Sequence, residues 1–521
     1  MTASFLLSEC LENIFSNLLD KNICNNKSIK DLYSCTLVSR YWCRISTPFL
    51  YEYPFHHFYY KYPDDAYFKL IRTLLSCIPK SEIEQIISSN TSNIQKLLSY
   101  FFRSNIKSYK PTFNYISFIR GLIFNDLLGS ELLLFCHRKI WLPPYISKNQ
   151  AQFQLSVTII DHLLKFLCKH CNNITVLDTT KNKGNNIFNM IELLTYKGSN
   201  GRSKLNDLKE LYYADSVVHK KDIYLTLSNN NICNLTLLYN EGFSFINSLS
   251  QFISLQKKLK HIILSENLYE PIIYDTNQHY SNKNTVFNSL STQSKSLQTL
   301  EFKYLLFSSI NQDALNSLRL LENIRELKLY ECMGVNDKLI PWAKSLTKLE
   351  VFEFVTYHSP SISEEFLIQL IQSSSNTLIK LIVNYGRRER QRTQLFKQIP
   401  TYLKSLVHLD LPKTYPDELI SIFGSCTKLI YLGIILPDFK LWIITFKNLG
   451  KFIPKNLQKI RFNGMNNSIF NCNELKSFLE GCVNNGKNLK YLEIIGKCEL
   501  DKKYFDIAEE FGIILNHVHI N

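Results

Sequence analysis

One pattern recurs along most of the chain: an apolar residue, two variable residues, a second apolar residue, one variable residue and a third apolar residue. Leu297–Phe302, Ile324–Leu329 and Leu406–Leu411 show it clearly. The twelve segments that fit or begin the series start at Ile174, Leu208, Ile232, Leu259, Leu297, Ile324, Leu349, Leu378, Leu406, Leu429, Leu457 and Leu489. Apolar residues at alternating positions predict strands, and one strand per repeat cannot bury its own apolar face, so the repeats must stack.

The segments between these strands predict helices. Phe366, Leu367, Leu370 and Ile371 lie at helical spacing, and the stretches 418–423 and 474–479 have the same character. A unit of one strand and one helix resembles the leucine-rich repeat. The resemblance implies an α/β solenoid over residues 174–521, a horseshoe of parallel strands with outer helices in about twelve repeats. An all-helical repeat array is the alternative, and the strand-like alternation argues against it.

The first fifty residues predict three short helices. Leu11, Ile14, Phe15 and Leu18 share one face of the first helix. A second helix follows, and Ser39 offers a cap for the third. Three helices of this size bury little surface, so part of their apolar face is available for docking.

Residues 5–51 strongly resemble an F-box. The most specific portion is Leu37-Val38-Ser39-Arg40-Tyr41-Trp42, and Ser8 stands where most F-boxes have proline. In that family the motif binds the Skp-type adaptor of the cullin–RING ubiquitin ligases called SCF. The resemblance implies adaptor contacts, shared in part with the bundle's own core, at Leu7, Leu11, Ile14, Phe15, Leu18, Leu32, Val38 and Trp42.

Residues 52–173 show neither motif. Apolar stretches around 67–77, 83–102 and 113–128 predict helices, and Trp141-Leu142-Pro143-Pro144 indicates a boundary. We therefore expect three segments: an F-box at 1–51, a helical linker that caps the solenoid at 52–173, and the repeats at 174–521.

The variable strand positions of the repeats are expected to face the concave side. Mixed aromatic and charged side chains on one sheet suit recognition of a protein segment. The candidate substrate-binding residues are Tyr212, Glu301, Lys303, Glu326, Lys328, Tyr330, Lys459, Arg461, Tyr491 and Glu493.

The formal net charge of +15 favours an acidic or phosphorylated substrate segment. Arg387, Arg388, Arg390 and Arg392 form the densest basic cluster, which we interpret as a solvated loop after a strand. A docking patch for an acidic segment or a phosphate is the alternative, because arginine binds such groups bidentately. No aromatic residues alternate with these arginines, which argues against nucleic acid.

Fourteen cysteines with no export signal indicate buried thiols in a reducing compartment, the cytoplasm or nucleus. His162, Cys168, His170 and Cys171 lack the second pair that a structural zinc site needs, so we predict no metal and no cofactor. No apolar run is long enough to span a membrane, and no membrane partner is expected.

An F-box followed by leucine-rich repeats resembles the substrate receptors of SCF ligases. The resemblance implies that the F-box holds the adaptor and cullin while the solenoid presents a protein for ubiquitin transfer. No catalytic motif is present, and we expect no enzyme activity. The alternative is a leucine-rich-repeat interaction scaffold without ligase activity.

Overall fold

The computed structural model separates the chain into two compact units, Met1–Ser248 and Leu249–Asn521. The sequence boundaries proposed at residues 51 and 173 stay predictions. The structure describes residues 6–18, 26–55, 65–89, 95–96, 98–99, 102, 111–125, 158, 162–181, 191, 194–195, 203–215, 222–266, 278–356, 362–384, 393–435, 449–465, 471–497 and 500–519.

The first unit begins with three packed helices. They are α1 (Ser8–Leu18), α2 (Asn26–Thr36) and α3 (Arg40–Leu50). Leu11, Phe15 and Leu32 are fully buried and form the core of this bundle. The Trp42 ring meets Phe15 edge to face, with ring centroids 5.5 Å apart. Ser39 caps α3 as the sequence predicts, because its Oγ accepts a hydrogen bond from the Trp42 backbone N–H at 3.1 Å.

Four parallel strands follow in the first unit. The other described elements of this unit are α4 (Asp65–Leu75), α5 (Lys80–Ser88), the 3-10 turn η3 (Tyr115–Phe118), β1 (Gly121–Asn125), β2 (Val176–Lys181), β3 (Glu210–Ala214), α10 (Ile223–Asn229) and β4 (Leu237–Glu241). Neighbouring strands in sequence are neighbours in the sheet.

The helix predicted around 113–128 is wrong, because this stretch contains β1. Leu122 and Ile123 are buried, and Leu122 pairs with Leu177 of β2. A short apolar run fits a helix or a strand equally well by its pattern, and here the open edge of β2 decides the outcome. The backbone N–H of Thr175 donates to the Arg120 carbonyl at 2.8 Å, which fixes β1 beside β2.

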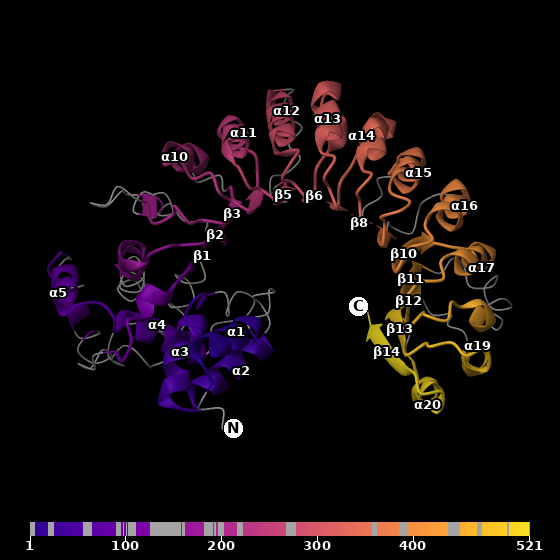
Figure 1. Cartoon of the computed structure of the whole chain (residues 1–521), viewed down its shortest axis with the longest axis horizontal. Coiled ribbons are helices and arrows are strands. Elements are labelled where there is room, and N and C mark those ends of the chain that lie inside the picture. The colour runs from indigo at the N-terminus through magenta and orange to yellow at the C-terminus, as the bar shows by residue number, and fades with distance from the viewer. Residues whose placement is uncertain are drawn as a thin grey trace. The chain divides into compact units, whose positions relative to one another are not determined.

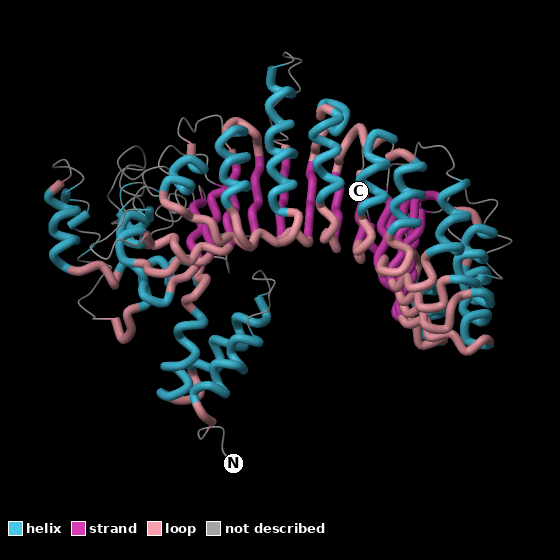
Figure 2. Tube along the Cα trace, turned by 45° about the horizontal axis from the view of Figure 1, so that its top comes forward, coloured by secondary structure: helices cyan, strands magenta, loops and turns pink. Residues whose placement is uncertain are grey.

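Ten further parallel strands form the second unit, each paired with the next along the chain. They are β5 (His261–Ser265), β6 (Thr299–Lys303), β7 (Glu326–Tyr330), β8 (Val351–Val355), β9 (Lys380–Asn384), β10 (His408–Lys413), β11 (Tyr431–Ile435), β12 (Lys459–Met465), β13 (Tyr491–Gly496) and β14 (Ile514–His519). Figures 1 and 2 show strands along the inner side of this unit and helices along its outer side.

The helices of the repeats lie between these strands. They are α11 (Ile246–Leu255), α12 (Gln278–Leu290), α13 (Gln312–Ser317), α14 (Ile340–Ser345), α15 (Glu364–Ser373), α16 (Thr393–Tyr402), α17 (Pro416–Ser425), α19 (Cys472–Asn484) and α20 (Lys502–Glu510). Short 3-10 turns are η4 (Ser291–Gln293), η5 (Phe307–Ser309), η6 (Leu318–Leu320) and η7 (Asp337–Leu339). The boundary between the two units falls within α11.

The repeat core lies between strands and helices. In β6, Leu300 and Phe302 are fully buried, while Thr299, Glu301 and Lys303 alternate with them. The Phe302 ring stacks with Phe287 of α12 at 5.5 Å between centroids. This alternation is the arrangement of a leucine-rich-repeat solenoid, in which the apolar strand positions meet the helices and the variable positions face away.

Each of the twelve predicted repeat segments contains or leads directly into a strand, from β2 to β13. The strands β1 and β14 extend the series at either end and are not marked by the full pattern. Within the described residues, no helix has both the length and the apolar composition that crossing a bilayer demands.

Candidate partner-binding surfaces

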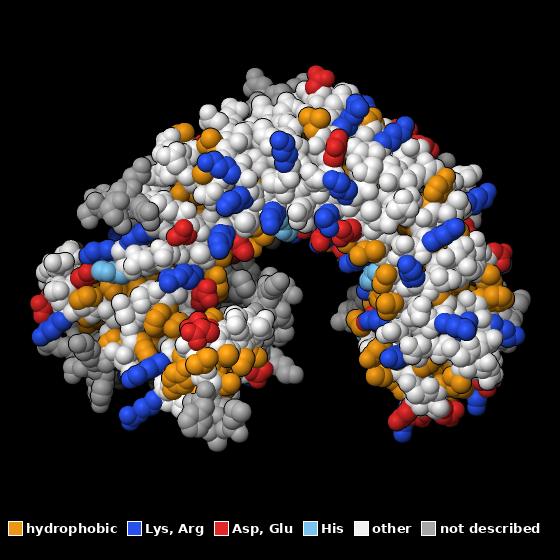
Figure 3. All heavy atoms as spheres, in the orientation of Figure 1, with side chains coloured by type: hydrophobic (Ala, Val, Ile, Leu, Met, Phe, Trp, Pro, Cys, Tyr) orange, Lys and Arg blue, Asp and Glu red, His pale blue; other side chains and the backbone are white. Residues whose placement is uncertain are grey.

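The three N-terminal helices carry an exposed apolar surface, which we call the apolar face. Its members are Leu7, Ile14, Tyr33, Leu37, Val38 and Tyr41. Leu37 is 70% exposed, Leu7 69% and Val38 59%. Figure 3 shows hydrophobic side chains gathered at the surface of this bundle. Exposed apolar side chains that cluster in this way mark interaction sites in soluble proteins.

Packing of the three helices decides which of these residues stay outside. Leu7 directly precedes α1 and Ile14 lies within it, and both are exposed although the fully buried Leu11 is on the same side of the helix. Leu37 and Val38 lie in the tight turn between α2 and α3, where the Leu37 N–H donates to the Ser34 carbonyl at 3.1 Å. A turn this short leaves both side chains no interior to enter, so they project into solvent.

The predicted adaptor residues divide into three groups by burial. Leu7, Ile14 and Val38 belong to the apolar face. Partly buried residues at the edge of the core are Leu18 and Trp42, and fully buried ones are Leu11, Phe15 and Leu32. Sequence reasoning left out Tyr33, Leu37 and Tyr41. The sequence could have indicated that Leu37 is exposed, because Leu37 directly precedes Val38 in a short turn and not on the buried side of an amphipathic helix.

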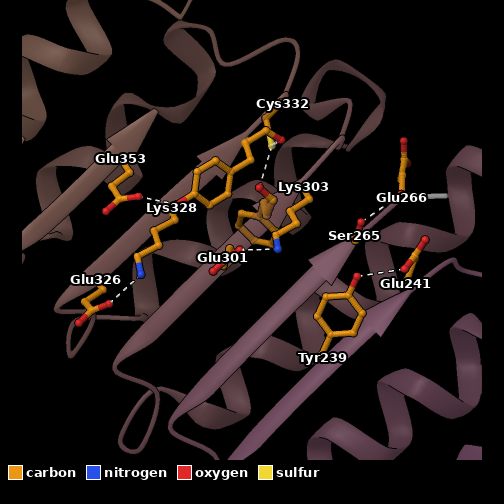
Figure 4. Close-up of polar contacts among 12 residues, drawn as sticks. Tyr239, Glu241, Ser265, Glu266, Glu301, Lys303, Glu326, Lys328, Cys332 and Glu353 are labelled. Atoms are coloured by element: carbon orange, nitrogen blue, oxygen red, sulfur yellow. Dashed lines mark hydrogen bonds and ion pairs between the residues drawn. The ribbon is translucent and has the colours of Figure 1, made fainter. Parts of the chain in front are cut away.

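Five ion pairs join ten charged side chains along the strands of the second unit. On β6, Lys303 Nζ lies 2.8 Å from Glu301 Oε1, and on β7 Lys328 Nζ lies 3.2 Å from Glu326 Oε2. The other three are Lys380–Glu353 at 2.7 Å, Lys459–Glu493 at 2.9 Å and Arg461–Asp410. Figure 4 shows the pairs on β6 and β7. In each pair the positive and the negative side chain neutralise each other, so these ten residues add no net charge to this part of the surface.

Glu353 on β8 is the centre of one polar group. Its carboxylate accepts a hydrogen bond from the Tyr330 hydroxyl on one side and pairs with Lys380 on the other. Burial alone would raise the pKa of Glu353, but the Lys380 and Tyr330 hydrogen bonds outweigh burial and lower it. Burial also raises the pKa of Tyr330, so its hydroxyl stays a donor.

A second polar group spans three strands. Asp410 of β10 is opposite Gly433 of β11, which is opposite Arg461 of β12. Arg461 pairs with Asp410 over the glycine. Burial raises the pKa of the Asp410 carboxyl, an effect that Arg461 partly offsets. Asp410 Oδ1 and Arg461 Nε are buried and make no hydrogen bond within the described chain.

An aromatic and basic row runs beside that group in one register. His408, Tyr431, Lys459, Tyr491 and Ile514 are successive partners on β10 to β14. The His408 and Tyr431 rings stack at 3.9 Å and 11°, and Lys459 Nζ lies 5.9 Å from the Tyr431 ring centroid. Burial and then nearby Lys380 and Arg461 lower the pKa of His408 to about 4. The His408 ring is therefore neutral at physiological pH.

Nine of the ten predicted substrate residues lie on these strands of the second unit. Tyr212, the tenth, belongs to β3 of the first unit, where its hydroxyl donates to Glu210 Oε2 at 3.1 Å. The sequence list omitted Glu353, Lys380, His408, Asp410 and Tyr431. The same rule of alternating strand positions points to all five.

The structure describes His162, Cys168, His170 and Cys171, the four potential zinc ligands of the sequence. Cys168 and Cys171 are fully buried, and no group of three or more potential ligands occurs in the described residues. Burial raises the pKa of both thiols, that of Cys171 to about 12. These thiols are therefore packed, protonated side chains. The arginine cluster at 387–392 and the Trp141–Pro144 boundary lie outside the described residues.

Comparison with protein-family models finds no match to this chain. Comparison with curated proteins finds no match either. Among solved structures, the chain is similar to the crystal structure of the leucine-rich repeat-containing protein LegL7 from Legionella pneumophila. The identity is 16% and the TM-score 0.32, over 64% of this chain and 95% of that one. Neither the fold described above nor the function proposed below depends on this similarity.

Proposed function

We propose that this chain is the substrate-recognition subunit of an SCF-type cullin–RING ubiquitin ligase. The N-terminal bundle would dock a Skp-type adaptor, which carries the cullin, and the inner strand face of the second unit would bind a protein substrate. The observation that supports docking best is the apolar face. Leu11, Phe15 and Leu32 already complete the bundle core, so Leu7, Leu37 and Val38 are not needed to hold it together.

The inner strand face supports recognition of a polypeptide. Its charges are paired, and its aromatic row is partly accessible, with Tyr491 39% exposed. The Lys459 and Arg461 side chains of this face remain partly accessible. A bound segment that adds hydrogen bonds to them would gain affinity and specificity together.

Paired charges alter the kind of substrate that we propose. A strongly acidic or phosphorylated segment needs unpaired cations, and the bases of the five pairs are already neutralised. A mixed segment, with apolar side chains against Tyr431 and Tyr491 and polar backbone groups over the ion pairs, fits this face better. The receptor would perform no bond chemistry itself. It would raise the local concentration of substrate lysines near the ubiquitin-carrying partner.

Co-expression with a Skp-type adaptor tests the docking step. We expect the wild-type chain and the adaptor to elute as one complex, and the double variant Leu37→Ser, Val38→Ser to elute alone. Leu225→Ser is the matched control, because Leu225 on α10 is also an exposed leucine of the first unit. A folded wild-type chain that binds no adaptor would overturn the ligase role. It would leave an interaction scaffold of leucine-rich repeats.

A further inference from the structure

The segments that lead into the strands of the second unit form a regular edge. The residue directly before each strand from β6 to β13 donates its backbone N–H to the equivalent residue of the preceding repeat. These residues, together with Lys260 at the start, are Lys260, Gln298, Arg325, Glu350, Ile379, Val407, Ile430, Gln458 and Lys490. The eight hydrogen bonds measure 2.7 to 2.9 Å between N and O, so the edge is rigid from repeat to repeat.

This edge is strongly basic. The four residues before each strand from β5 to β13 contain eleven bases and two acids. The bases are Lys257, Lys258, Lys260, Lys295, Arg325, Lys348, Lys404, Lys428, Lys455, Lys487 and Lys490, and all but the half-buried Lys487 are exposed. The acids are Glu322 and Glu350, and Glu350 pairs with Arg325 at 2.8 Å. We call these eleven residues the basic edge. Figure 3 shows Lys and Arg side chains recurring along one face of the second unit.

Exposed apolar side chains occur among these bases. Ile379 and Ile430 directly precede β9 and β11, and five more residues lie within the last two positions of the helical segments that lead to these strand starts. Those five are Leu255, Leu320, Tyr402, Phe452 and Val483. All seven are between 36% and 57% exposed. An edge that served solubility alone would not need apolar side chains at these places.

We propose that the basic edge docks the second unit onto the surface of an anionic lipid bilayer. Lysines attract the acidic headgroups, and the apolar side chains between them enter the interface. Nine strands at about 4.8 Å spacing give an edge roughly 40 Å long, which can meet many headgroups at once. The sequence predicts no membrane partner because it contains no run long enough to span a bilayer, but peripheral docking needs no spanning segment.

The composition of the edge favours lipid over nucleic acid. Ten of the eleven bases are lysines, which act as hydrated point charges rather than as bidentate phosphate ligands. Five of the seven apolar side chains are aliphatic, and only Tyr402 and Phe452 could stack on bases. Nucleic acid is therefore the competing outcome of the experiment.

The experiment is flotation of the full chain with phosphatidylcholine vesicles and with vesicles in which roughly one lipid in three is phosphatidylserine. We expect binding to the anionic vesicles only, and weaker binding at high salt. The test variant combines Lys257→Glu, Lys258→Glu, Lys404→Glu and Lys455→Glu. Each lysine near an anionic surface is worth about fivefold in binding, so a loss of more than about tenfold is expected.

The matched control reverses four exposed lysines that lie outside the basic edge, at Lys338 in η7, Lys413 at the end of β10, Lys497 directly after β13 and Lys502 at the start of α20: Lys338→Glu, Lys413→Glu, Lys497→Glu and Lys502→Glu. It has the same net charge as the test variant and should keep most of the binding. Equal losses in both variants, or no binding by the wild-type chain, would overturn the proposal. Binding to a DNA duplex but not to anionic vesicles would overturn it in favour of nucleic acid. Adaptor binding should be unchanged in both variants, so this proposal and the ligase role can fail separately.

Discussion

Arg461 on β12 forms an ion pair with Asp410 on β10, two strands away in the sheet. The pair crosses β11 at Gly433, the residue opposite both partners in register. A Cβ atom at Gly433 would lie 2.7 Å from Asp410 Oδ1 and 2.8 Å from Oδ2. Glycine is therefore required here by the close approach of the carboxylate.

Gly433→Ala should disrupt the ion pair between Arg461 and Asp410. The added methyl group meets the carboxylate, which must move away from Arg461 and leave a buried charge without its partner. We expect the free energy of unfolding to fall by about 1–3 kcal/mol, measured by denaturant titration. Gly424→Ala is the control, because Gly424 in α17 has open space and alanine is favoured within a helix. Equal stability of the two variants would contradict the steric explanation.

The lowered pKa of His408 predicts a pH-dependent stability. The folded chain holds this pKa at about 4, against a usual value of 6.5. Between these values the unfolded chain binds a proton that the folded chain does not, so the free energy of unfolding falls as pH drops from about 6.5 to 4. His408→Phe keeps a ring against Tyr431 but removes the titration, and should flatten this loss.

Thermal unfolding of both proteins at several pH values measures the difference. Asp410 titrates in the opposite sense, because its raised pKa favours the protonated form in the folded chain. The other charged neighbours of His408 are Lys380, Arg461 and Glu353, and the lowered pKa of Glu353 keeps its carboxylate ionised to lower pH. The His408→Phe variant retains all four groups. Parallel pH profiles for the two proteins would contradict the assignment to His408.

Loss of the Glu353 carboxylate should lower the free energy of unfolding more than loss of the Glu326 carboxylate, although both pair with lysine. Glu353 is buried and accepts from Tyr330 and Lys380, so Glu353→Ala leaves two donors without their acceptor. We expect a loss of about 1–3 kcal/mol in the free energy of unfolding. Glu326→Ala removes only a solvent-accessible pair and should cost less than about 1 kcal/mol. Denaturant titration of both variants measures these changes. A similar fall in the free energy of unfolding for both would show that Glu353 is not the centre of this group.

The sequence predicted the repeat strands well because each carries its own alternating pattern, from β2 to β13. It missed β1, whose five residues fit a helix or a strand and become a strand only beside Val176–Lys181. It also missed β14, since Ile514–His519 lacks the leading apolar residues of the repeat. Tertiary pairing fixes both strands, and no local pattern contains that information.

The candidate surfaces could be predicted in part. Alternation identified Arg461 and Lys459 as outward-facing, but it could not show that Arg461 reaches Asp410 across a neighbouring strand. In the bundle, spacing along one helix cannot separate core from surface residues without the neighbouring helices. Phe15 is fully buried and Ile14 is 43% exposed, although both fit one apolar stripe of the first helix by their spacing.

That division of the N-terminal bundle predicts two kinds of variant. Phe15→Ala removes a fully buried ring that contacts Trp42 and Phe49, and should lower the local stability of the bundle by about 3–5 kcal/mol. Leu37→Ser changes a side chain in solvent and should stay within about 0.5 kcal/mol of wild type. Amide hydrogen exchange of α1 to α3 measures this directly, because it reports each segment of a chain with two units separately. If the amides of these helices exchanged faster in Leu37→Ser as well, Leu37 would be part of the bundle core. Failure of the Leu37→Ser, Val38→Ser variant to bind an adaptor would then reflect unfolding of the bundle instead of a lost contact.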